Sequence, residues 1–228
     1  MKFSGQKIRA IVFDFDGVVV DSEPLYERAE ARLFAEYGVT IPTSDWRLFK
    51  GLSDCDFFTL CKEKYGIREE LSVLQKKGKC LLKEEIRNNL RYIDGFEDFI
   101  QEIRSSFLIG LVTSTQRTFM NWIFQNTPIR NHFEMMITAE NVSHQKPQPE
   151  PYLKMAELMQ IRPEEMIVLE DSLNGVKSAM SSGAVTIAFL SSFPKEAFEA
   201  ADYFAATYDD IREIILSIAS RDKLFSCI

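Results

Sequence analysis

Short apolar runs recur along the chain, and most are separated by stretches long enough to form a helix. A continuous apolar run bounded by polar residues is typical of a strand that is buried on both faces. The runs are Ile11–Phe13, Ile109–Val112, Met135–Ile137, Met166–Leu169 and Val185–Leu190. Amphipathic helices are predicted at Gly95–Arg104, Arg117–Gln125, Glu150–Gln160, Leu173–Ser182 and Ile211–Ser220, with Gly183 as a C-cap. This alternation predicts an α/β fold with a Rossmann-like, doubly wound parallel sheet.

One interval breaks the alternation of strands and helices. About ninety residues separate the first apolar run from the second, far more than a crossover helix requires. Within this interval apolar residues recur four residues apart from Leu25 to Tyr37, which indicates a helix. We therefore expect an inserted helical cap domain at residues 21–93 and an α/β core domain made of residues 1–20 and 94–228. The cap is expected over the carboxyl ends of the strands, where ligands bind in such sheets.

Composition and charge restrict the partners of the protein. With 228 residues and 46% hydrophobic side chains, the chain can bury a sizeable core. The net charge is −7 without a lysine or arginine stripe, so we expect no nucleic-acid partner, and a phosphorylated ligand would need local positive groups. Four cysteines without a Cys-x-x-Cys pair and only two histidines weigh against zinc. No stretch approaches the roughly 18 apolar residues of a membrane span, so we expect a soluble, cytoplasmic protein.

Two acidic residues, Asp14 and Asp16, directly follow the first apolar run and precede Gly17. Because side chains alternate in an extended chain, both acids face the same side, and Gly17 lets the backbone leave the strand sharply. Two like charges at such short range favour the binding of a divalent cation. The alternative is a solvated turn after a strand, since Asp and Gly are common in turns.

Hydrogen-bond donors and a lysine follow in the middle of the chain. Thr113 and Ser114 come after the second apolar run, where hydroxyl groups and free N–H groups suit phosphate oxygens. Lys146 lies in a proline-rich segment before a predicted helix, and its ammonium would neutralise charge on a phosphoryl group. Each has an ordinary alternative, because Ser and Thr often cap helices and most lysines are solvated.

Two further acids, Glu170 and Asp171, follow the fourth apolar run. Acids this close to a buried strand must be paired or bound to a metal if they are buried, although an N-cap aspartate is the alternative. All four groups of residues follow strands or lie in the loops after them, so we expect them to meet at one edge of the sheet. Together they match the components of phosphoryl transfer: a nucleophile, oxygen-binding donors, a cation and magnesium ligands.

These motifs resemble those of the haloacid dehalogenase superfamily, and within it the phosphatase and beta-phosphoglucomutase-like branch that carries a helical cap after the first strand. The resemblance covers essentially the whole chain, and the four motifs occur in the family's order. They are Asp14-Phe15-Asp16-Gly17-Val18, Thr113 with Ser114, Lys146 with Pro147, and Glu170-Asp171-Ser172 with Asn174-Gly175. The resemblance implies a phosphohydrolase that uses magnesium (Mg²⁺) and passes through an aspartyl-phosphate.

The resemblance also implies catalytic and metal-binding roles. Asp14 would be the nucleophile, and Asp16 would protonate the leaving oxygen and later activate water. Magnesium would lie between Asp14, the backbone carbonyl of Asp16 and Asp171. Glu170 would be a further ligand or a partner of the ligands.

The phosphate group would be held by a second set of residues. The resemblance assigns Thr113, the N–H of Ser114, Gly17 and Lys146 to this set. Thr113 and Lys146 would therefore serve both phosphate binding and catalysis.

Two positions in the inserted segment separate phosphatases from mutases in this family. Mutases have a histidine where this chain has Tyr26, and an arginine beyond a Lys-Gly pair where this chain has Asp54 after Lys50–Ser53. We therefore predict hydrolysis of a small phosphorylated metabolite, such as a sugar phosphate, phosphoglycolate or a nucleotide monophosphate. A phosphosugar mutase and a non-catalytic binding protein of the same fold are the alternatives. The sequence leaves the oligomeric state open.

Overall fold

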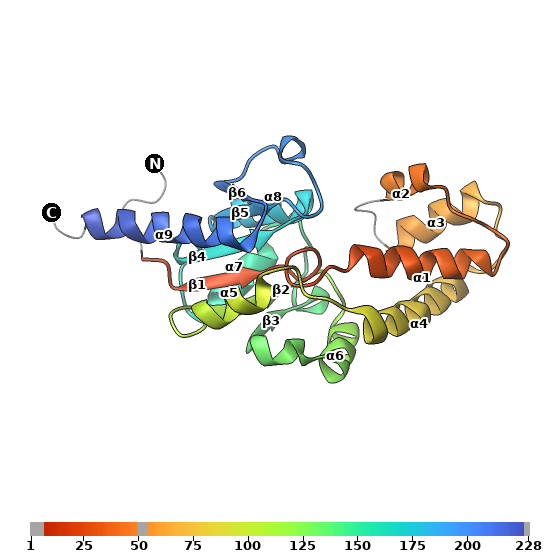
Figure 1. Ribbon diagram of the computed structural model, residues 1–228, viewed down its shortest axis with the longest axis horizontal. Coiled ribbons are helices and arrows are strands. Elements are labelled where there is room, and N and C mark those ends of the chain that lie inside the picture. Colours follow the sequence, from red (N-terminus) through yellow and green to blue (C-terminus); the bar gives the residue numbers. More distant parts are fainter. Residues whose placement is uncertain (1–6, 50–53, 226–228) are drawn as a thin grey trace. The chain divides into compact units, whose positions relative to one another are not determined.

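The chain divides into two compact units in the computed structural model, which describes residues 7–49 and 54–225 (Figure 1). The core unit comprises Met1–Val20 and Tyr92–Ile228, and the helical unit comprises Asp21–Arg91. In the core unit, Val20 and Tyr92 form an antiparallel bridge at the point where the chain leaves and returns. None of the described helices combines the length and the apolar character needed to cross a lipid bilayer.

The core unit contains a parallel sheet, and its six described strands have the order β3-β2-β1-β4-β5-β6. The strands are β1 (Ala10–Phe13), β2 (Leu108–Val112), β3 (Met135–Ile137), β4 (Met166–Glu170), β5 (Val185–Phe189) and β6 (Tyr203–Ala205). The predicted α/β fold with a parallel sheet is confirmed. The edge strand β6 was not predicted, because its three residues lie among alanines on both sides, which favour helices, whereas the equally short edge strand β3 stands out as an apolar run.

Helices alternate with these strands at the positions that the amphipathic pattern predicts. They are α5 (Phe96–Ile103), α6 (Arg117–Asn126), α7 (Glu150–Met159), α8 (Leu173–Ser182) and α9 (Tyr208–Phe225), with 3-10 turns η1 (Pro128–His132), η2 (Ala139–Asn141), η3 (Pro163–Glu165) and η4 (Lys195–Ala197). Helix α8 shows why its bounds were readable from sequence. Ser172 caps it by accepting a hydrogen bond from Gly175 N at 3.0 Å, and Gly183 ends it in the left-handed conformation.

Both faces of the sheet are covered, which explains why β1 is a continuous apolar run. Successive side chains of a strand point to opposite faces. Val12 belongs to a buried cluster that includes Tyr152 of α7 and Ala179 of α8. Phe13, the next residue, instead packs its ring against Phe96 of α5, with 5.8 Å between the ring centroids. Each residue of β1 is therefore buried.

The strand register aligns the polar motifs that follow β1, β2 and β4 side by side at one edge of the sheet. Phe13 pairs with Leu111 of β2 on one side and with Leu169 of β4 on the other. Asp14 therefore leaves the sheet beside the end of β2 and beside Glu170. Because these strands are parallel, their carboxyl ends share one edge.

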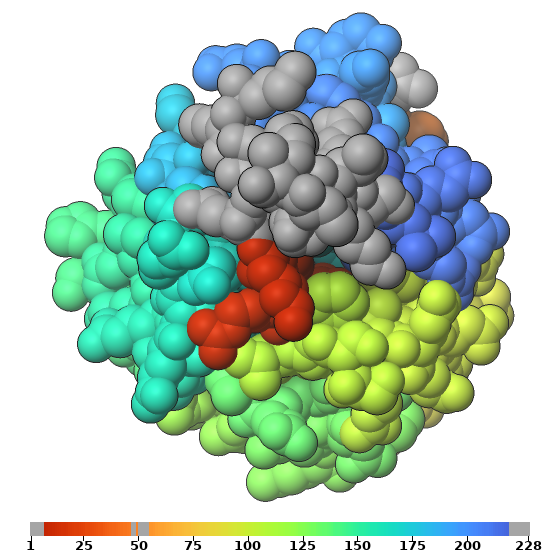
Figure 2. All heavy atoms as spheres, turned by 90° about the vertical axis from the view of Figure 1, so that its left-hand side faces the viewer, coloured from red at the N-terminus to blue at the C-terminus, as the bar shows by residue number. Residues whose placement is uncertain are grey.

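The opposite edge of the sheet is formed by the amino ends of the strands. Figure 2 shows the red segment at the start of the described chain between the yellow-green segment that leads into β2 and the blue-green segment that leads into β4. Arg9 makes the corresponding backbone hydrogen bonds, since its N–H donates to Glu165 O and its carbonyl accepts from Leu108 N.

The helical unit has its own hydrophobic core. Its described helices are α1 (Glu23–Ala35), α2 (Thr43–Phe49), α3 (Asp54–Lys64) and α4 (Leu71–Asn89). Helix α1 packs along α4, and aromatic rings such as Phe34 and Phe57 meet with centroids 5.9 Å apart. Gly78 lets α4 approach α3, because a Cβ there would lie 2.7 Å from the ring of Phe58. The helical character that the sequence indicates between the first two strands is thus present.

Candidate active site

Asp14 lies where β1 ends, in the middle of the sheet. Its backbone N–H donates to Leu169 O at 3.0 Å, which continues the pairing of β1 with β4 by one residue. The Asp14 side chain is nearly buried, with 8% of the residue exposed. The chain then makes a tight loop in which the N–H groups of Val19 and Val20 both donate to Phe15 O. Asp16, in this loop, is half-buried.

Gly17 is placed against Asp171, the acid that directly follows β4. Its φ is +71°, and a Cβ added there would lie 1.9 Å from Asp171 Oδ2. A side chain would therefore displace the Asp171 carboxylate as well as strain the backbone. The carbonyl of Gly17 accepts a hydrogen bond of 2.6 Å from Ser191 Oγ, in the loop after β5. Gly17 thus serves a close approach of two loops.

Lys146 reaches the end of β1 from the loop before α7. Its Nζ lies 2.6 Å from Asp14 Oδ1 and 2.6 Å from Glu170 Oε1, and it also donates to Val112 O at 3.3 Å. Only 6% of the lysine side chain is exposed. The peptide bond between Lys146 and Pro147 is cis. The lysine that the sequence singled out is therefore a buried cation shared by two carboxylates.

Glu170 and Asp171 have different partners although they are neighbours. Glu170 is fully buried, and its Oε1 accepts hydrogen bonds from Lys146 and from Tyr152 OH, the latter at 2.5 Å. Its Oε2 accepts from Ser172 Oγ at 3.1 Å. Asp171 turns its Oδ2 toward the loop after β5, where Ser192 Oγ donates to it.

The electrostatic situation of the acids is unfavourable without a further cation. Burial raises the pKa of Asp14 well above its usual range, and the nearby charge of Glu170 raises it further. Burial and Glu170 likewise raise the pKa of Asp171 to about 7. Burial alone would lower the pKa of Lys146, but Asp14 and Glu170 outweigh it and raise this pKa. Lys146 therefore stays protonated, whereas the positive charge around Asp14 and Asp171 is too small to offset their burial.

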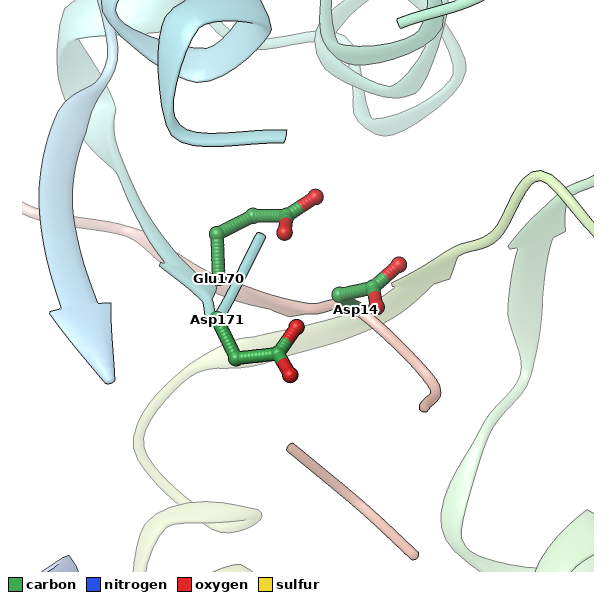
Figure 3. A group of neighbouring side chains, drawn as sticks. All are labelled: Asp14, Glu170 and Asp171. Carbon is green, nitrogen blue, oxygen red and sulfur yellow. The ribbon is translucent and has the colours of Figure 1, made fainter. Parts of the chain in front are cut away.

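The acids fit a divalent cation. Asp14, Glu170 and Asp171 each offer an oxygen, and these oxygens lie within 4.8 Å of one another (Figure 3). Within the described part of the chain, no hydrogen bond is made to Asp14 Oδ2 or to Asp171 Oδ1. Three carboxylates and one ammonium would sum to a charge of −2, which a hard divalent ion with a preference for oxygen ligands would offset. The donor set therefore suits a hard divalent cation.

Two of the four phosphate-binding residues predicted from the sequence, Thr113 and Ser114, directly follow β2. Thr113 is buried, its N–H donates to Ile137 O, and its Oγ1 accepts from Thr115 N at 3.1 Å. Ser114 is exposed, and within residues 7–49 and 54–225 its N–H donates no hydrogen bond. These contacts leave the N–H of Ser114 able to receive an anion.

Three residues with contacts in this site were not predicted: Tyr152, Ser191 and Ser192. The two serines follow the apolar run of β5, so the rule that selected the other motifs could have found them. Tyr152 gave no such signal, since it reads as an apolar position of α7. The stretch Lys50–Ser53, which bears on the mutase alternative, lies outside the described residues.

A parallel sheet with acids and a lysine at the carboxyl ends of its central strands is typical of α/β enzymes that transfer phosphoryl groups. Comparison with known proteins agrees with this class. Residues 11–189 match the model of the haloacid dehalogenase-like hydrolase family, and the chain belongs to that family. The resemblance expected from the four motifs is thus confirmed.

Similar proteins include several phosphatases. A phosphorylated carbohydrates phosphatase of Thermotoga maritima is 28% identical over 77% of this chain and 82% of its own length. A phosphoglycolate phosphatase of Salmonella typhimurium is 26% identical, over 80% of this chain and 81% of its own. Among solved structures, a candidate beta-phosphoglucomutase of Thermotoga maritima has a TM-score of 0.82 and 26% identity, over 92% of this chain and 99% of that one.

Proposed function

We propose that this protein is a magnesium-dependent phosphatase that hydrolyses a small phosphorylated metabolite through an aspartyl-phosphate on Asp14. The proposal depends on one observation: Asp14, Asp171 and Lys146 meet at the carboxyl ends of adjacent strands in a member of this family. The relatives named for phosphorylated carbohydrates and phosphoglycolate support a sugar phosphate or a phosphorylated small acid as the substrate.

In the first step, Asp14 would attack the phosphorus of the ester. A new bond forms between the carboxylate oxygen and phosphorus, and the bond from phosphorus to the alcohol oxygen breaks. Asp16 gives its proton to that oxygen, so the substrate leaves as a neutral alcohol. Lys146, 2.6 Å from Asp14, reduces the repulsion between the nucleophile and the anionic phosphate.

In the second step, Asp16 would take a proton from a water molecule that attacks the same phosphorus. The bond to Asp14 breaks, and inorganic phosphate leaves with Asp14 again a carboxylate. Thr113 and the N–H of Ser114 would hold the phosphate oxygens during both steps. The half-buried position of Asp16 is compatible with access by water.

Asp14 and Asp171, with the backbone carbonyl of Asp16, would hold the magnesium ion. When bound, the ion would neutralise charge on the phosphate and keep these acids ionised. Burial and Glu170 otherwise raise the pKa of Asp14, which disfavours the ionised form that a nucleophile needs.

The nucleophile can be tested by substitution. Asp14→Asn should abolish phosphate release from a panel of phosphorylated metabolites in the presence of magnesium, and acid quenching should trap phosphate on Asp14 of the parent protein. Asp45→Asn is the matched control, because Asp45 is also a buried aspartate with lysine and tyrosine partners, Lys64 and Tyr65. Phosphate release by Asp14→Asn at the parent rate would refute the assignment. A parent protein without activity on any ester would favour a non-catalytic binding protein.

We propose that the helical unit acts as a cap that admits and selects the substrate. The support is its position in the chain, as a compact insertion between β1 and β2. If the cap must move, chemical crosslinking of the helical unit to the core unit should impair turnover. Normal turnover of the crosslinked protein would count against this role.

A phosphosugar mutase is the second candidate. It is supported by the similarity to the solved structure of a candidate beta-phosphoglucomutase from Thermotoga maritima. Tyr26, where mutases carry a histidine, argues against it. The two activities differ in the acceptor of the phosphoryl group. Labelled phosphate should pass from the substrate to water in a phosphatase, whereas transfer mainly to an added sugar phosphate would establish the mutase.

The cytoplasm is the proposed location of the protein. The described cysteines Cys55, Cys61 and Cys80 are all free thiols, as a reducing compartment would maintain them. Fractionation of the producing cells would test this location, and recovery of the protein from the medium would contradict it.

A further inference from the structure

Tyr152, in the first turn of α7, is buried and contacts two residues of the site. Its hydroxyl donates to Glu170 Oε1 at 2.5 Å, and the Lys146 Nζ lies 5.3 Å from the centre of its ring. The residue itself is completely inaccessible to solvent. One side chain therefore provides both a hydrogen-bond donor to the carboxylate and an aromatic face near the ammonium, a favourable arrangement for a cation.

Glu170 is held in place from several directions. Tyr152 and Lys146 donate to one carboxylate oxygen, and Ser172 donates to the other. Gly175 leaves the space that the carboxylate needs, because a Cβ there would lie 1.9 Å from Glu170 Oε2. The glutamate cannot follow Lys146 if the lysine moves, so it acts as a fixed anchor.

Lys146 is shared evenly between this anchor and the proposed nucleophile. Its Nζ is 2.6 Å from Glu170 Oε1 and 2.6 Å from Asp14 Oδ1. Two buried carboxylates compete for one ammonium, and the stronger acceptor would draw the lysine toward itself. A second donor on Glu170 Oε1 weakens that oxygen as an acceptor for the lysine.

We propose that Tyr152 is a positioning residue, whose hydroxyl on Glu170 and ring beside Lys146 hold the lysine ammonium against Asp14. This inference rests on the proposed function, since the lysine is needed there when Asp14 attacks a phosphate ester. The hydroxyl lies 2.5 Å from the fully buried Glu170 carboxylate and acts as a donor to it.

Tyr152→Phe tests the hydroxyl while it keeps the ring. We expect kcat to fall about tenfold and KM to change less than twofold, because the lysine acts mainly as charge develops in the transition state. Tyr152→Leu, which also removes the aromatic face, should lower kcat further. Circular dichroism and thermal unfolding would confirm that each variant is folded.

The matched control is Tyr65→Phe in the helical unit. Tyr65 OH donates to Asp45 Oδ2 at the same 2.5 Å, and a lysine, Lys64, contacts the same carboxylate at 2.8 Å. The control thus removes an equivalent phenol–carboxylate bond from residues to which no catalytic role is assigned. Its kcat should equal that of the parent protein.

A double mutant separates positioning from a general loss of packing. If Tyr152 acts through Glu170, the pair Tyr152→Phe with Glu170→Gln should be no slower than Glu170→Gln alone, whereas independent effects would multiply. Multiplying effects, a kcat of Tyr152→Phe within twofold of an active parent, or an equal loss in Tyr65→Phe would each overturn the inference alone. A parent protein inactive on every ester would overturn the proposed function and this inference with it.

Discussion

Both units bury a glutamate that is paired with one or more basic side chains, but the balance of charge around it differs. In the helical unit, Glu85 accepts hydrogen bonds from Arg28 at 3.0 Å, Arg32 at 2.8 Å and Asn89 at 2.9 Å. Arg28, followed by the opposing effect of burial and then by Arg32 and Asn89, gives a net lowering of the pKa of Glu85. Arg32 also pairs with Glu84 at 2.9 Å, so two cations there face two carboxylates, which is the arrangement of a balanced ion-pair network that joins α1 to α4.

In the core unit, one cation serves three carboxylates. Lys146 contacts Asp14 and Glu170, and Asp171 lies beside them. Burial raises the pKa of both Asp14 and Asp171, the opposite of the shift at Glu85. An ion pair that only stabilises the fold would not require this excess of buried negative charge. The difference between the units supports the proposal that the core cluster is the active site and binds a further cation.

The largest difference is expected when a cation is removed from each unit. Lys146→Met should lower kcat by about 10²–10³-fold, because no other ammonium contacts Asp14 among the described residues. Arg32→Met should leave kcat unchanged and lower the free energy of unfolding by about 1 kcal/mol or less, since Arg32 is half-exposed and Glu85 retains Arg28. Steady-state kinetics and urea unfolding would measure both. A kcat for Lys146→Met within threefold of that of the parent would contradict the catalytic role of Lys146 and the contrast between the two units.

The pH dependence of stability without metal should show the excess of acids. Because the folded pKa of Asp171, about 7, is above its reference value of 3.8, the folded state binds the proton more tightly than the unfolded state. The resulting stabilisation is present below about pH 4 and is lost as the pH rises toward 7, on the order of 4 kcal/mol in all. Asp14 contributes in the same direction.

Urea unfolding in a chelator between pH 4 and 8 would measure this loss. Other groups also titrate in this range, so the informative quantity is the difference between the parent protein and Asp171→Asn, whose stability should decline less. Added magnesium should abolish the decline in the parent by favouring the ionised acids. Identical profiles of stability against pH for the parent and Asp171→Asn would contradict the raised pKa of Asp171 in the folded state.

The smallest effect concerns the glycines at positive φ in each unit. Gly17 and Gly38 have φ values of +71° and +73°, but a Cβ at Gly17 would meet Asp171 Oδ2 at 1.9 Å, whereas one at Gly38 meets nothing within 4 Å. Alanine at either position should cost about 1–2 kcal/mol of stability through backbone strain. Only Gly17→Ala should also weaken magnesium binding, by about tenfold or more, since it displaces an acid of the site.

Calorimetric titration with magnesium and urea unfolding would compare the two alanine variants. Gly38→Ala controls for the strain, because it shares the conformation without the contact. Equal magnesium affinity in both variants would show that Asp171 does not depend on the space at Gly17.

Much of the fold could be predicted because it depends on local patterns of apolar and polar residues in the sequence. The apolar runs of β1, β2 and β4 and the amphipathic pattern of α7 and α8 each reflect burial that repeats with the period of the element. The polar residues that end the runs of β1 and β4 singled out Asp14 and Asp171, since the carboxyl ends of parallel strands must meet, and the proline-rich segment before α7 singled out Lys146. The strand β6 was missed, although the other edge strand, β3, is equally short and equally buried, because the alanines that flank β6 favour helices and hide its apolar residues.

The sequence by itself determined which residue types stand at the ends of the central strands, because strand periodicity and turn chemistry act between neighbours in the chain. Only the tertiary structure decided their partners: Tyr152 on Glu170, Ser192 on Asp171, and Lys146 between two acids. It also decided that the acids are short of positive charge, since that depends on burial and on distances between residues more than a hundred positions apart. Side-chain packing and strand register decide both the partners of these residues and the shortage of positive charge, and neither leaves a local pattern in the sequence.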